Sequence, residues 1–553
     1  MTKKTEVDSN LWASTPGKQR GVVMSTGGMV ASAHPLVTAT GIEVLQRGGN
    51  AMDAAIAMAG VSCIVLPAMC GLGGDTFLIH YDAKTRQVEA LNGSGIAPYG
   101  ATLEHYAALG YTSKMPLSGP LAVAVPGSPD AFATAMDRWG SWTLEQVLEP
   151  AINYAENGFP VSELLAGQLR SNQSKLAQFP ETARTFLKQD GSCYQAGELF
   201  RQPDYAASLR LFAQQGAAAF YWGEIADRLV QHMAATGGLI GERELREHRS
   251  DIYQPEHVDY RGYQIYQTSP PSQGLIMLEE MAILAGFDLA AKGPDSGEAV
   301  HLMVEAKKLA YADRLAFAQD PKLATTPFTR LFSPEYAARR RQAIDPLQAA
   351  RVMQPGDPDG DTTSFVVVDK DGNAVSFIHS LSLAFGSGVT IPGTGILLNN
   401  RAGRGFVLDP DHPNCLAPGK KTMHTLNTYL VTWQGEPYLV GNTPGGDGQP
   451  QWNMQTVVNC LDFGMSVFEA VTAPRWTSVP GTDPATIEQP VRLRMESRFP
   501  KPLRDNLAQL GHEIQVVDGW AGGGSVQLIL IDPRTKVRYG ASDPRGDGSC
   551  IGY

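Results

Sequence analysis

The sequence predicts an α+β protein, and the order of its helical and extended segments carries that prediction. Residues 130–350 are rich in helical patterns such as LEQVLEPAINYAENG and EAVHLMVEAKKLAYADRLAFA. From residue 362 onward the chain changes to short extended runs, among them SFVVVD, AVSFIHS, TYLVTW, PYLVGN and SVQLILID. Helices concentrated in one part of a chain and strands in another are typical of layered α+β folds.

The N-terminal region combines both kinds of element. The pattern predicts a strand at 29–33, a helix at about 35–47, and a second, very apolar helix from Ala51. Gly48 and Gly49 separate the two helices, as glycines after a helix commonly do. The run GLGGDTFLIHYD then predicts a strand. Farther along, the helical spacing around Val300 and Val304 predicts a core-facing helix with its Lys and Arg side chains on the solvent side.

Composition places the chain among globular proteins. It has 553 residues, of which 43% are hydrophobic and 18% charged. At ~150 residues per domain, this length allows three or four domains or one large integrated domain. The formal charge of -11 argues against a broad nucleic-acid surface. The basic N-terminus is followed by no apolar run, and the uncharged stretch 54–74 is broken by Pro and Gly, so we expect a cytoplasmic protein without a membrane span.

Several common sites fit the sequence poorly. Asp357-x-Asp359-x-Asp361 resembles the start of a calcium loop, but Thr362 and Val368 occupy the positions that need Gly and an acid. The histidines lack metal-ligand spacing, and the six cysteines form no C-x-x-C pair and are expected to be free and mostly buried. No G-x-S-x-G elbow is present. We therefore expect no metal and no cofactor, while the Gly-Gly pair of PGGDGQ can point backbone N–H groups at an oxyanion.

Thr362 is the strongest nucleophile candidate because of the loop before it. The segment PGDPDGD ends directly at Thr362, and a strand, the turn 371–373 and a second strand follow. A Thr at a strand start is usually structural. A Thr hydroxyl presented by a strained loop, however, can attack the preceding carbonyl and cleave the chain. The freed α-amine, with a pKa near ~8, can then act as the base for the same hydroxyl.

The chain resembles the gamma-glutamyltranspeptidase family of N-terminal-nucleophile hydrolases over roughly residues 21–553. The shared motifs are TTSFVVVDKDGNAVSF, GTGILLNN, PGKKTMHT, TPGGDGQPQ, ASDPRGD, GMVASAHPLVTATGIEVLQRGGNAMDAAIA, GLGGDTF and VEAKKLAYADR. The resemblance implies a four-layer αββα sandwich. It also implies a precursor that cleaves itself between Asp361 and Thr362 into a large chain, 1–361, and a small chain, 362–553, which together form one integrated domain.

The resemblance also assigns roles to four residues. Thr362 corresponds to the nucleophile. Ser380 lies where the family has a Thr whose hydroxyl bonds to that nucleophile. Gly445 and Gly446 correspond to the pair that forms the oxyanion hole.

Departures from the family pattern concern substrate binding. Ser94 stands at the position of an Arg that holds the glutamyl α-carboxylate, and Ser382 stands at the position of an Asn. In the family, a Gln and an acidic residue after LLNN hold the α-amine. Here Arg401 stands at the Gln position, and Arg404 lies near the acidic position. His424 and Thr425 replace a Ser pair. Two guanidiniums would repel an ammonium and could hold a carboxylate, unless one or both point to solvent.

We therefore expect an autoprocessed amidohydrolase that cleaves the amide of a small carboxylate acid without an α-amine. Oxamate, cleaved to oxalate and ammonia in purine catabolism, is the leading substrate. The alternatives are γ-glutamyl hydrolysis or transfer, a glutaryl acylase of the cephalosporin type, and a non-enzymatic, unprocessed protein that binds a small acid. The expected partners are the small-molecule substrate and the two chains of one precursor, with a dimer of such pairs also open; neither nucleic acid nor membrane is expected.

Overall fold

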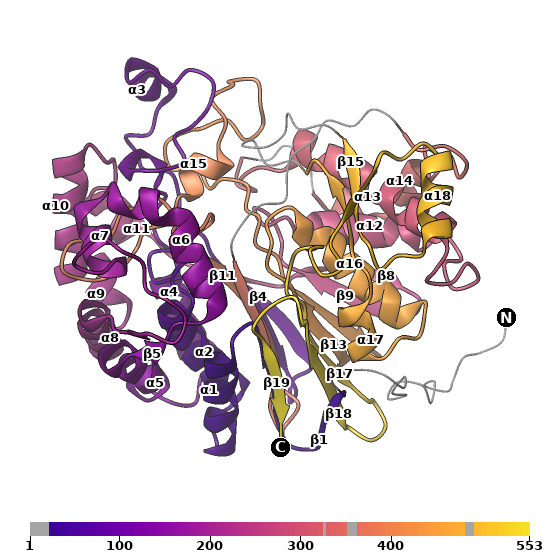
Figure 1. Cartoon of the computed structure of the whole chain (residues 1–553), viewed down its shortest axis with the longest axis horizontal. Helices are drawn as coiled ribbons and strands as arrows, with labels where there is room; N and C mark the ends of the chain where they lie inside the picture. The colour runs from indigo at the N-terminus through magenta and orange to yellow at the C-terminus, as the bar shows by residue number, and fades with distance from the viewer. Residues whose placement is uncertain (1–20, 324–327, 351–361, 482–490) are drawn as a thin grey trace.

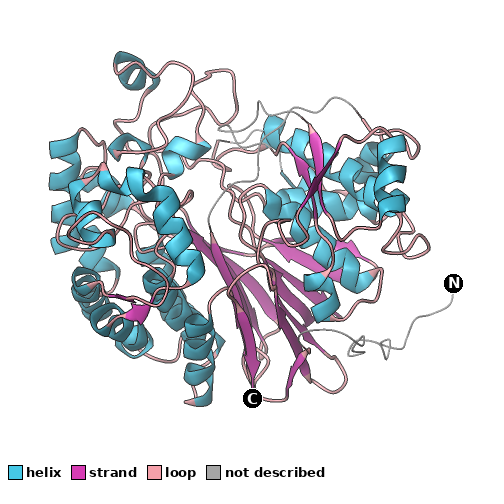
Figure 2. Cartoon of the chain, in the orientation of Figure 1, coloured by secondary structure: helices cyan, strands magenta, loops and turns pink. Residues whose placement is uncertain are grey.

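The computed structural model describes residues 21–323, 328–350, 362–481 and 491–553. Two seven-stranded sheets, antiparallel throughout, lie face to face at its centre, with helices outside each of them (Figures 1 and 2). The β10 sheet has the order β19 (Ser549–Gly552), β2 (Met29–Ser32), β10 (Thr363–Val368), β11 (Ala374–Ser380), β3 (Asp75–Asp82), β4 (Gln87–Gly93) and β7 (Asp251–Tyr253). The β13 sheet has the order β1 (Val23–Ser25), β18 (Arg538–Ser542), β17 (Gln527–Ile531), β13 (Glu436–Asn442), β12 (Tyr429–Trp433), β9 (Tyr263–Gln267) and β8 (Glu256–Tyr260).

The helical layers lie on opposite sides of this pair of sheets (Figure 1). Beyond the β10 sheet are α1 (Pro35–Gln46), α2 (Ala51–Val65), α4 (Ser128–Trp139), α5 (Leu144–Asn157), α6 (Glu163–Ala177), α7 (Pro180–Phe186), α8 (Pro203–Gln215), α9 (Ala217–Tyr221), α10 (Glu224–Thr236) and α11 (Glu242–Glu247). Beyond the β13 sheet are α12 (Gly274–Leu284), α13 (Gly297–Phe317), α14 (Pro334–Arg341), α16 (Gly448–Leu461), α17 (Val467–Thr472) and α18 (Lys501–Gln509). The remaining elements are α3 (Leu103–Ala108), α15 (Arg401–Gly405), β5 (Phe159–Pro160), β6 (Leu199–Phe200), β14 (Trp476–Val479), β15 (Arg492–Glu496), β16 (Ile514–Val517) and the 3₁₀ turns Pro120–Ala122 and Phe328–Arg330.

Strand β10 shows how the four layers are built. Its alternate side chains face opposite ways, as the pleat of a strand requires. Phe365 and Val367 belong to the core shared with the helices over the β10 sheet, whereas Val366 and Val368 belong to the core between the two sheets. Both faces of the strand are therefore dry, which explains why its sequence is a continuous apolar run. The expected αββα sandwich is confirmed.

The predicted N-terminal elements are also present. Helix α1 begins at Pro35 and ends before Gly48, which has a φ of 95°. Helix α2 begins with a capping box, in which Asn50 accepts from the backbone of Asp53 while Asp53 accepts from the backbone of Asn50. All fifteen residues of α2 are buried, so every side of the helix packs against the protein. Among the described residues, no helix is both long and apolar enough to cross a membrane.

One expectation about α13 is wrong. Its Lys and Arg side chains were expected on the solvent side, but Lys307, Lys308 and Arg314 are all buried. Polar partners replace water for each of them. Arg314 forms an ion pair with Asp447 at 2.6 Å, Lys308 pairs with Glu305 at 2.7 Å, and Lys307 donates to backbone carbonyls.

Candidate active site

Thr362 lies at the start of the β10–β11 hairpin and is almost completely buried. Pairing of β10 with β11 brings both ends of the hairpin to the same edge of the sheet. Thr362 Oγ1 consequently donates to Ser380 Oγ at 3.2 Å, and the N–H of Ser382 donates to the same oxygen at 2.8 Å. Ser382 has a φ of 90°, a conformation that residues other than Gly rarely adopt. The expected cleavage partner Asp361 lies outside the described residues.

Gly445 and Gly446 form a sharp turn before α16. Their φ angles are 123° and 50°, and a Cβ on Gly445 would lie 2.2 Å from the ring of Trp452, so only Gly fits there. Their carbonyls accept from the first turn of α16, at 2.9 Å and 3.2 Å. Within the described parts of the chain, no acceptor contacts the N–H group of either glycine. Two adjacent backbone donors in this state can stabilise an oxyanion.

Gln273, a residue that sequence reasoning missed, holds this turn from the same helical layer, beyond the β13 sheet. The residue precedes α12 and is fully buried. Its Nε2 donates to the carbonyl of Gly446 at 2.8 Å and also to the carbonyl of Thr425. One amide group therefore connects the glycine turn to the segment that carries His424 and Thr425. A Gln between a Pro-Pro-Ser turn and an apolar helix gives no local signal of this role.

Arg401 and Arg404 both point into the protein from the short helix α15. Each side chain is 1% exposed. Arg401 Nη1 donates to Thr425 Oγ1 at 3.2 Å, and Arg404 Nη1 donates to the carbonyl of Ser382 at 2.9 Å. The alternative in which these guanidiniums point to solvent is therefore wrong. The contact to Ser382 places Arg404 two residues from the Ser380 hydroxyl that Thr362 contacts.

Asp75 is a second buried residue that sequence reasoning did not single out. Its Oδ2 lies 3.5 Å from Arg401 Nε and accepts from His424 Nε2 at 2.9 Å, while its Oδ1 accepts from the N–H of Gly95 at 3.2 Å. The signal was present in GLGGD: a Cβ on Gly74 would lie 2.3 Å from the carbonyl oxygen of Ser380. The glycines thus let the chain pass tightly against the hairpin and deliver Asp75 beside it.

His424 is a neutral hydrogen-bond donor in this cluster. Its Nδ1 accepts from the N–H of Leu426 at 3.2 Å, so the proton is on Nε2, which faces Asp75. Burial and the nearby Arg401 guanidinium lower the pKa of His424 to about 3, against the opposing effect of Asp75. With His424 neutral, Arg401, Arg404 and Asp75 are the charged side chains named in this cluster. A guanidinium can bind a carboxylate through two parallel hydrogen bonds.

Ser94 directly follows β4. Its Oγ donates to Asn92 Oδ1 at 2.6 Å, and its N–H donates to the same oxygen at 2.9 Å. The hydroxyl is therefore engaged with its own strand end, while the next residue, Gly95, contacts Asp75. Of the six expected substrate-binding residues, the structure thus gathers Arg401, Arg404, Ser382, His424 and Thr425 around Asp75 or the hairpin, and the Ser94 hydroxyl turns to Asn92.

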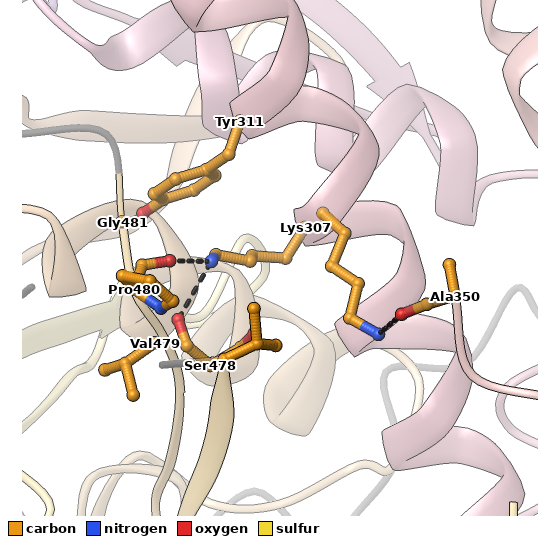
Figure 3. Close-up of a pocket in the computed structure, with 9 residues that line it drawn as sticks. Lys307, Tyr311, Ala350, Ser478, Val479, Pro480 and Gly481 are labelled. Carbon is orange, nitrogen blue, oxygen red and sulfur yellow. Dashed lines mark hydrogen bonds between the residues drawn. The ribbon is translucent and has the colours of Figure 1, made fainter. Parts of the chain in front are cut away.

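A small pocket beside α13 is lined by Lys307, Tyr311 and Ser478, among others (Figure 3). Lys307 Nζ donates to the carbonyls of Ser478 at 2.8 Å and Pro480 at 3.0 Å, and lies 4.1 Å from the centre of the Tyr311 ring. Burial lowers the pKa of Lys307 to about 7. Tyr311 donates through its hydroxyl to the carbonyl of Asp447, which follows the two glycines. Tyr311 thus links this pocket to the residue that follows the glycine turn.

Comparisons with known proteins agree with this architecture. The family model described as Gamma-glutamyltranspeptidase matches residues 37–553. The chain is 39% identical over 532 residues to the glutathione hydrolase-like YwrD proenzyme of Bacillus subtilis, covering 96% of this chain and 99% of that one. It is 34% identical over 538 residues to the oxamate amidohydrolase proenzyme of Klebsiella pneumoniae, with coverage of 96% and 99%. The crystal structure of cephalosporin acylase from Bacillus halodurans superposes with a TM-score of 0.90 at 35% identity, covering 98% of each chain.

The family match spans most of the chain, and these relatives are aligned over nearly their whole lengths. The chain therefore belongs to the gamma-glutamyltranspeptidase family, and it is an enzyme that acts on amides, as its sequence predicts.

Proposed function

We propose that this chain is a proenzyme that cleaves itself between Asp361 and Thr362 and then hydrolyses the amide of a small carboxylate acid, with oxamate as the leading substrate. The observation that carries the proposal is the buried pair Arg401 and Arg404, of which Arg404 contacts Ser382, two residues after the Ser380 that Thr362 contacts. The relatives support processing, because those of Bacillus subtilis and Klebsiella pneumoniae are both named proenzymes.

Cleavage would leave the two chains in one fold. Strand β10 of the small chain pairs with β2 of the large chain, and β11 of the small chain pairs with β3 of the large chain. These ladders lie between two buried cores. A cut before Thr362 therefore breaks one covalent bond without exposing the sheet, and frees an amine beside the hydroxyl.

In the proposed reaction, Thr362 Oγ attacks the amide carbonyl and its α-amine takes the hydroxyl proton. The N–H groups of Gly445 and Gly446 stabilise the tetrahedral oxyanion; losing one such donor typically costs ~100–1000-fold in rate. The amine returns the proton to the leaving nitrogen, so ammonia departs and an acyl-Thr ester remains. Water then attacks this ester, releases the acid and restores Thr362. Ser380, through its contact with Thr362 Oγ1, would orient the hydroxyl.

Arg401 and Arg404 would select the acyl group. A guanidinium binds a carboxylate through two parallel hydrogen bonds. The same positive charge would repel the α-ammonium of a glutamyl group, so the site would discriminate against γ-glutamyl substrates. Thr425 and His424 would position Arg401 and Asp75 rather than contact the reacting bond.

A glutaryl acylase is the second candidate. A glutaryl group also ends in a carboxylate without an α-amine, and the overall similarity to a cephalosporin acylase supports this alternative. Hydrolysis of γ-glutamyl compounds is the third, supported by the relative named as glutathione hydrolase-like. Hydrolysis of a γ-glutamyl compound requires a hydrogen-bond acceptor for the substrate ammonium. The carboxylate of Asp75 already contacts His424, Gly95 and Arg401, which argues against this candidate.

The first test is the mass of the denatured protein. Two chains that split before Thr362 in the wild type, and one uncut chain in Thr362→Ala, are expected; an uncut wild type would favour the small-acid binding protein. Ammonia release from oxamate and from L-glutamine, and acid release from a glutaryl anilide, are then measured with the processed protein. Turnover of L-glutamine alone would refute the assignment of Arg401 and Arg404.

A further inference from the structure

Three soft or borderline donor side chains meet in the core beside the hairpin. Cys63 lies in the last turn of α2, Cys70 lies in the loop before β3, and His379 lies on β11 directly before Ser380. All three are buried, with exposures of 1%, 1% and 0%. One donor atom from each lies within 4.8 Å of the others. The three come from separate segments, which explains why no spacing motif announces them.

The hydrogen bonds of Ser62 fix the protonation of His379. Ser62 Oγ donates its only proton to the carbonyl of Ala59 at 2.9 Å. Its 2.8 Å contact with His379 Nε2 therefore has the histidine as donor. In a neutral imidazole, Nδ1 then carries the lone pair. Among the described residues this buried Nδ1 has no hydrogen-bond partner.

This arrangement is the one that prepares a histidine as a metal ligand. Histidines that bind metals usually donate their other ring N–H to a protein oxygen, which fixes the tautomer and the ring direction. The unpartnered Nδ1 lone pair of His379 would otherwise be a cost, because buried polar atoms without partners are rare. The sulfur atoms of Cys63 and Cys70 lie within 4.8 Å of each other and of one ring nitrogen of His379.

The thiols suit such a role. Thiolates select soft cations such as Cu⁺ and also bind Zn²⁺. With metal–sulfur distances of ~2.3 Å and metal–nitrogen distances of ~2.0 Å, the donors of a bound ion lie up to ~4 Å apart. The observed limit of 4.8 Å requires only a small closure.

We propose that Cys63, Cys70 and His379 form a binding site for one thiophilic d10 metal ion, Cu⁺ or Zn²⁺. Binding forms two metal–sulfur bonds and one metal–nitrogen bond and releases the thiol protons to solvent. Three donors satisfy Cu⁺, whereas structural Zn²⁺ sites take four; Cu⁺ is therefore the better fit. The ion would join the loop before β3 to β11 beside Ser380. This inference goes beyond the proposed amide hydrolysis and does not depend on it.

Because the site is fully buried, the ion must enter while the chain folds. The full-length protein is therefore produced in medium supplemented with copper or with zinc, purified under reducing conditions and treated with a chelator before elemental analysis. About one ion per chain is expected in the wild type and in the uncut Thr362→Ala variant. Retention in that variant separates the metal site from the hydrolase proposal.

The matched control is Cys460, a buried thiol on α16 that lies outside the cluster. Cys460→Ala should keep the ion, whereas Cys63→Ala with Cys70→Ala should lose it at least tenfold. X-ray absorption of the loaded wild type, which needs no variant, should show two sulfur ligands and one nitrogen ligand. One copper or one zinc per chain with this spectrum identifies the ion. The absence of both, retention by the double variant, or a Cys63–Cys70 disulfide in the reduced protein would overturn the proposal.

Discussion

Replacing Arg401 by Met separates its part in folding from its proposed part in binding. Arg401 Nε lies 3.5 Å from Asp75 Oδ2, which corresponds to a Coulomb attraction of about 5 kcal/mol at an effective dielectric constant of about 20. Removing one partner of a buried ion pair typically costs about 3–5 kcal/mol, because the other charge stays buried. We therefore expect Arg401→Met to lower the free energy of unfolding by about that amount. The double variant Arg401→Met with Asp75→Asn should lose less free energy of unfolding than Arg401→Met alone, because no unpaired charge stays buried.

The kinetic effect should depend on the charge of the substrate. A hydrogen bond to a charged group contributes about 1.5–3 kcal/mol, which corresponds to about 10–150-fold. We expect kcat/KM for ammonia release from oxamate to fall by about that factor in Arg401→Met. The neutral amide oxamide, measured in parallel, should change little. The kcat/KM of Arg401→Lys for oxamate should lie between those of the wild type and Arg401→Met, because lysine keeps the positive charge but lacks the planar guanidinium.

Two comparisons decide the outcome. Arg138→Met removes an exposed guanidinium, paired with Glu89 at 2.9 Å, and should leave both reactions unchanged. Processing, measured by mass, should continue in every variant. If oxamate and oxamide lose rate equally in the folded double variant, Arg401 acts on the structure of the site and does not bind the substrate carboxylate.

Gln273→Met removes the donor to the Thr425 and Gly446 carbonyls, and we expect kcat for ammonia release to fall about 10-fold or more. The Thr425 carbonyl loses the Gln273 amide and the Gly446 carbonyl keeps only the N–H of Gln449, so the turn loosens; an unchanged kcat would contradict this. Burial lowers the pKa of His80 to about 4, below its usual value near 6.5. Between pH 6.5 and pH 4 this histidine is therefore protonated in the unfolded chain but neutral in the folded one. The free energy of unfolding should fall as the pH drops through this range. Urea unfolding at pH 7 and pH 4.5 should show a loss of about 2–3 kcal/mol from this group, absent in His80→Gln. The profile of kcat/KM from pH 5 to 9 should show the α-amine of the nucleophile and no histidine, because the pKa of His424 is about 3; a limb that disappears in His424→Gln would refute this.

The parts of the fold that follow from local pattern could be predicted from the sequence. The helix breaks at Gly48 and Gly49, the strand of SFVVVD and the hairpin turn at 371–373 all depend on neighbours in the chain. The position of Thr362 beside Ser380 follows from the same hairpin. These features need only the propensities and periodicity of a short segment.

The residues that sequence reasoning missed join distant segments. Asp75 and His424 are 349 positions apart, and Gln273 and Gly446 are 173 apart. Nothing in either segment shows which partner the fold will bring to it. The wrong expectation for α13 has the same origin, since the buried Arg314 is paired with Asp447, which lies 133 residues away in the sequence. A helical pattern identifies a polar residue but not whether its partner is water or a buried carboxylate.

The charges around Thr362 would serve both the proposed binding of a carboxylate and the proposed activation of the nucleophile. Thr362 is almost fully buried, so an ammonium freed there by cleavage would lose hydration, which lowers its pKa. Arg404, held on Ser382, adds a repulsive positive charge in the same direction. We infer that the guanidiniums that attract a substrate carboxylate also keep the α-amine of Thr362 neutral and able to accept a proton. A site that held a substrate ammonium would need added negative charge near the same amine, which would raise its pKa and weaken the base. The proposed loss of ammonium recognition and the activation of the threonine would then have one electrostatic cause.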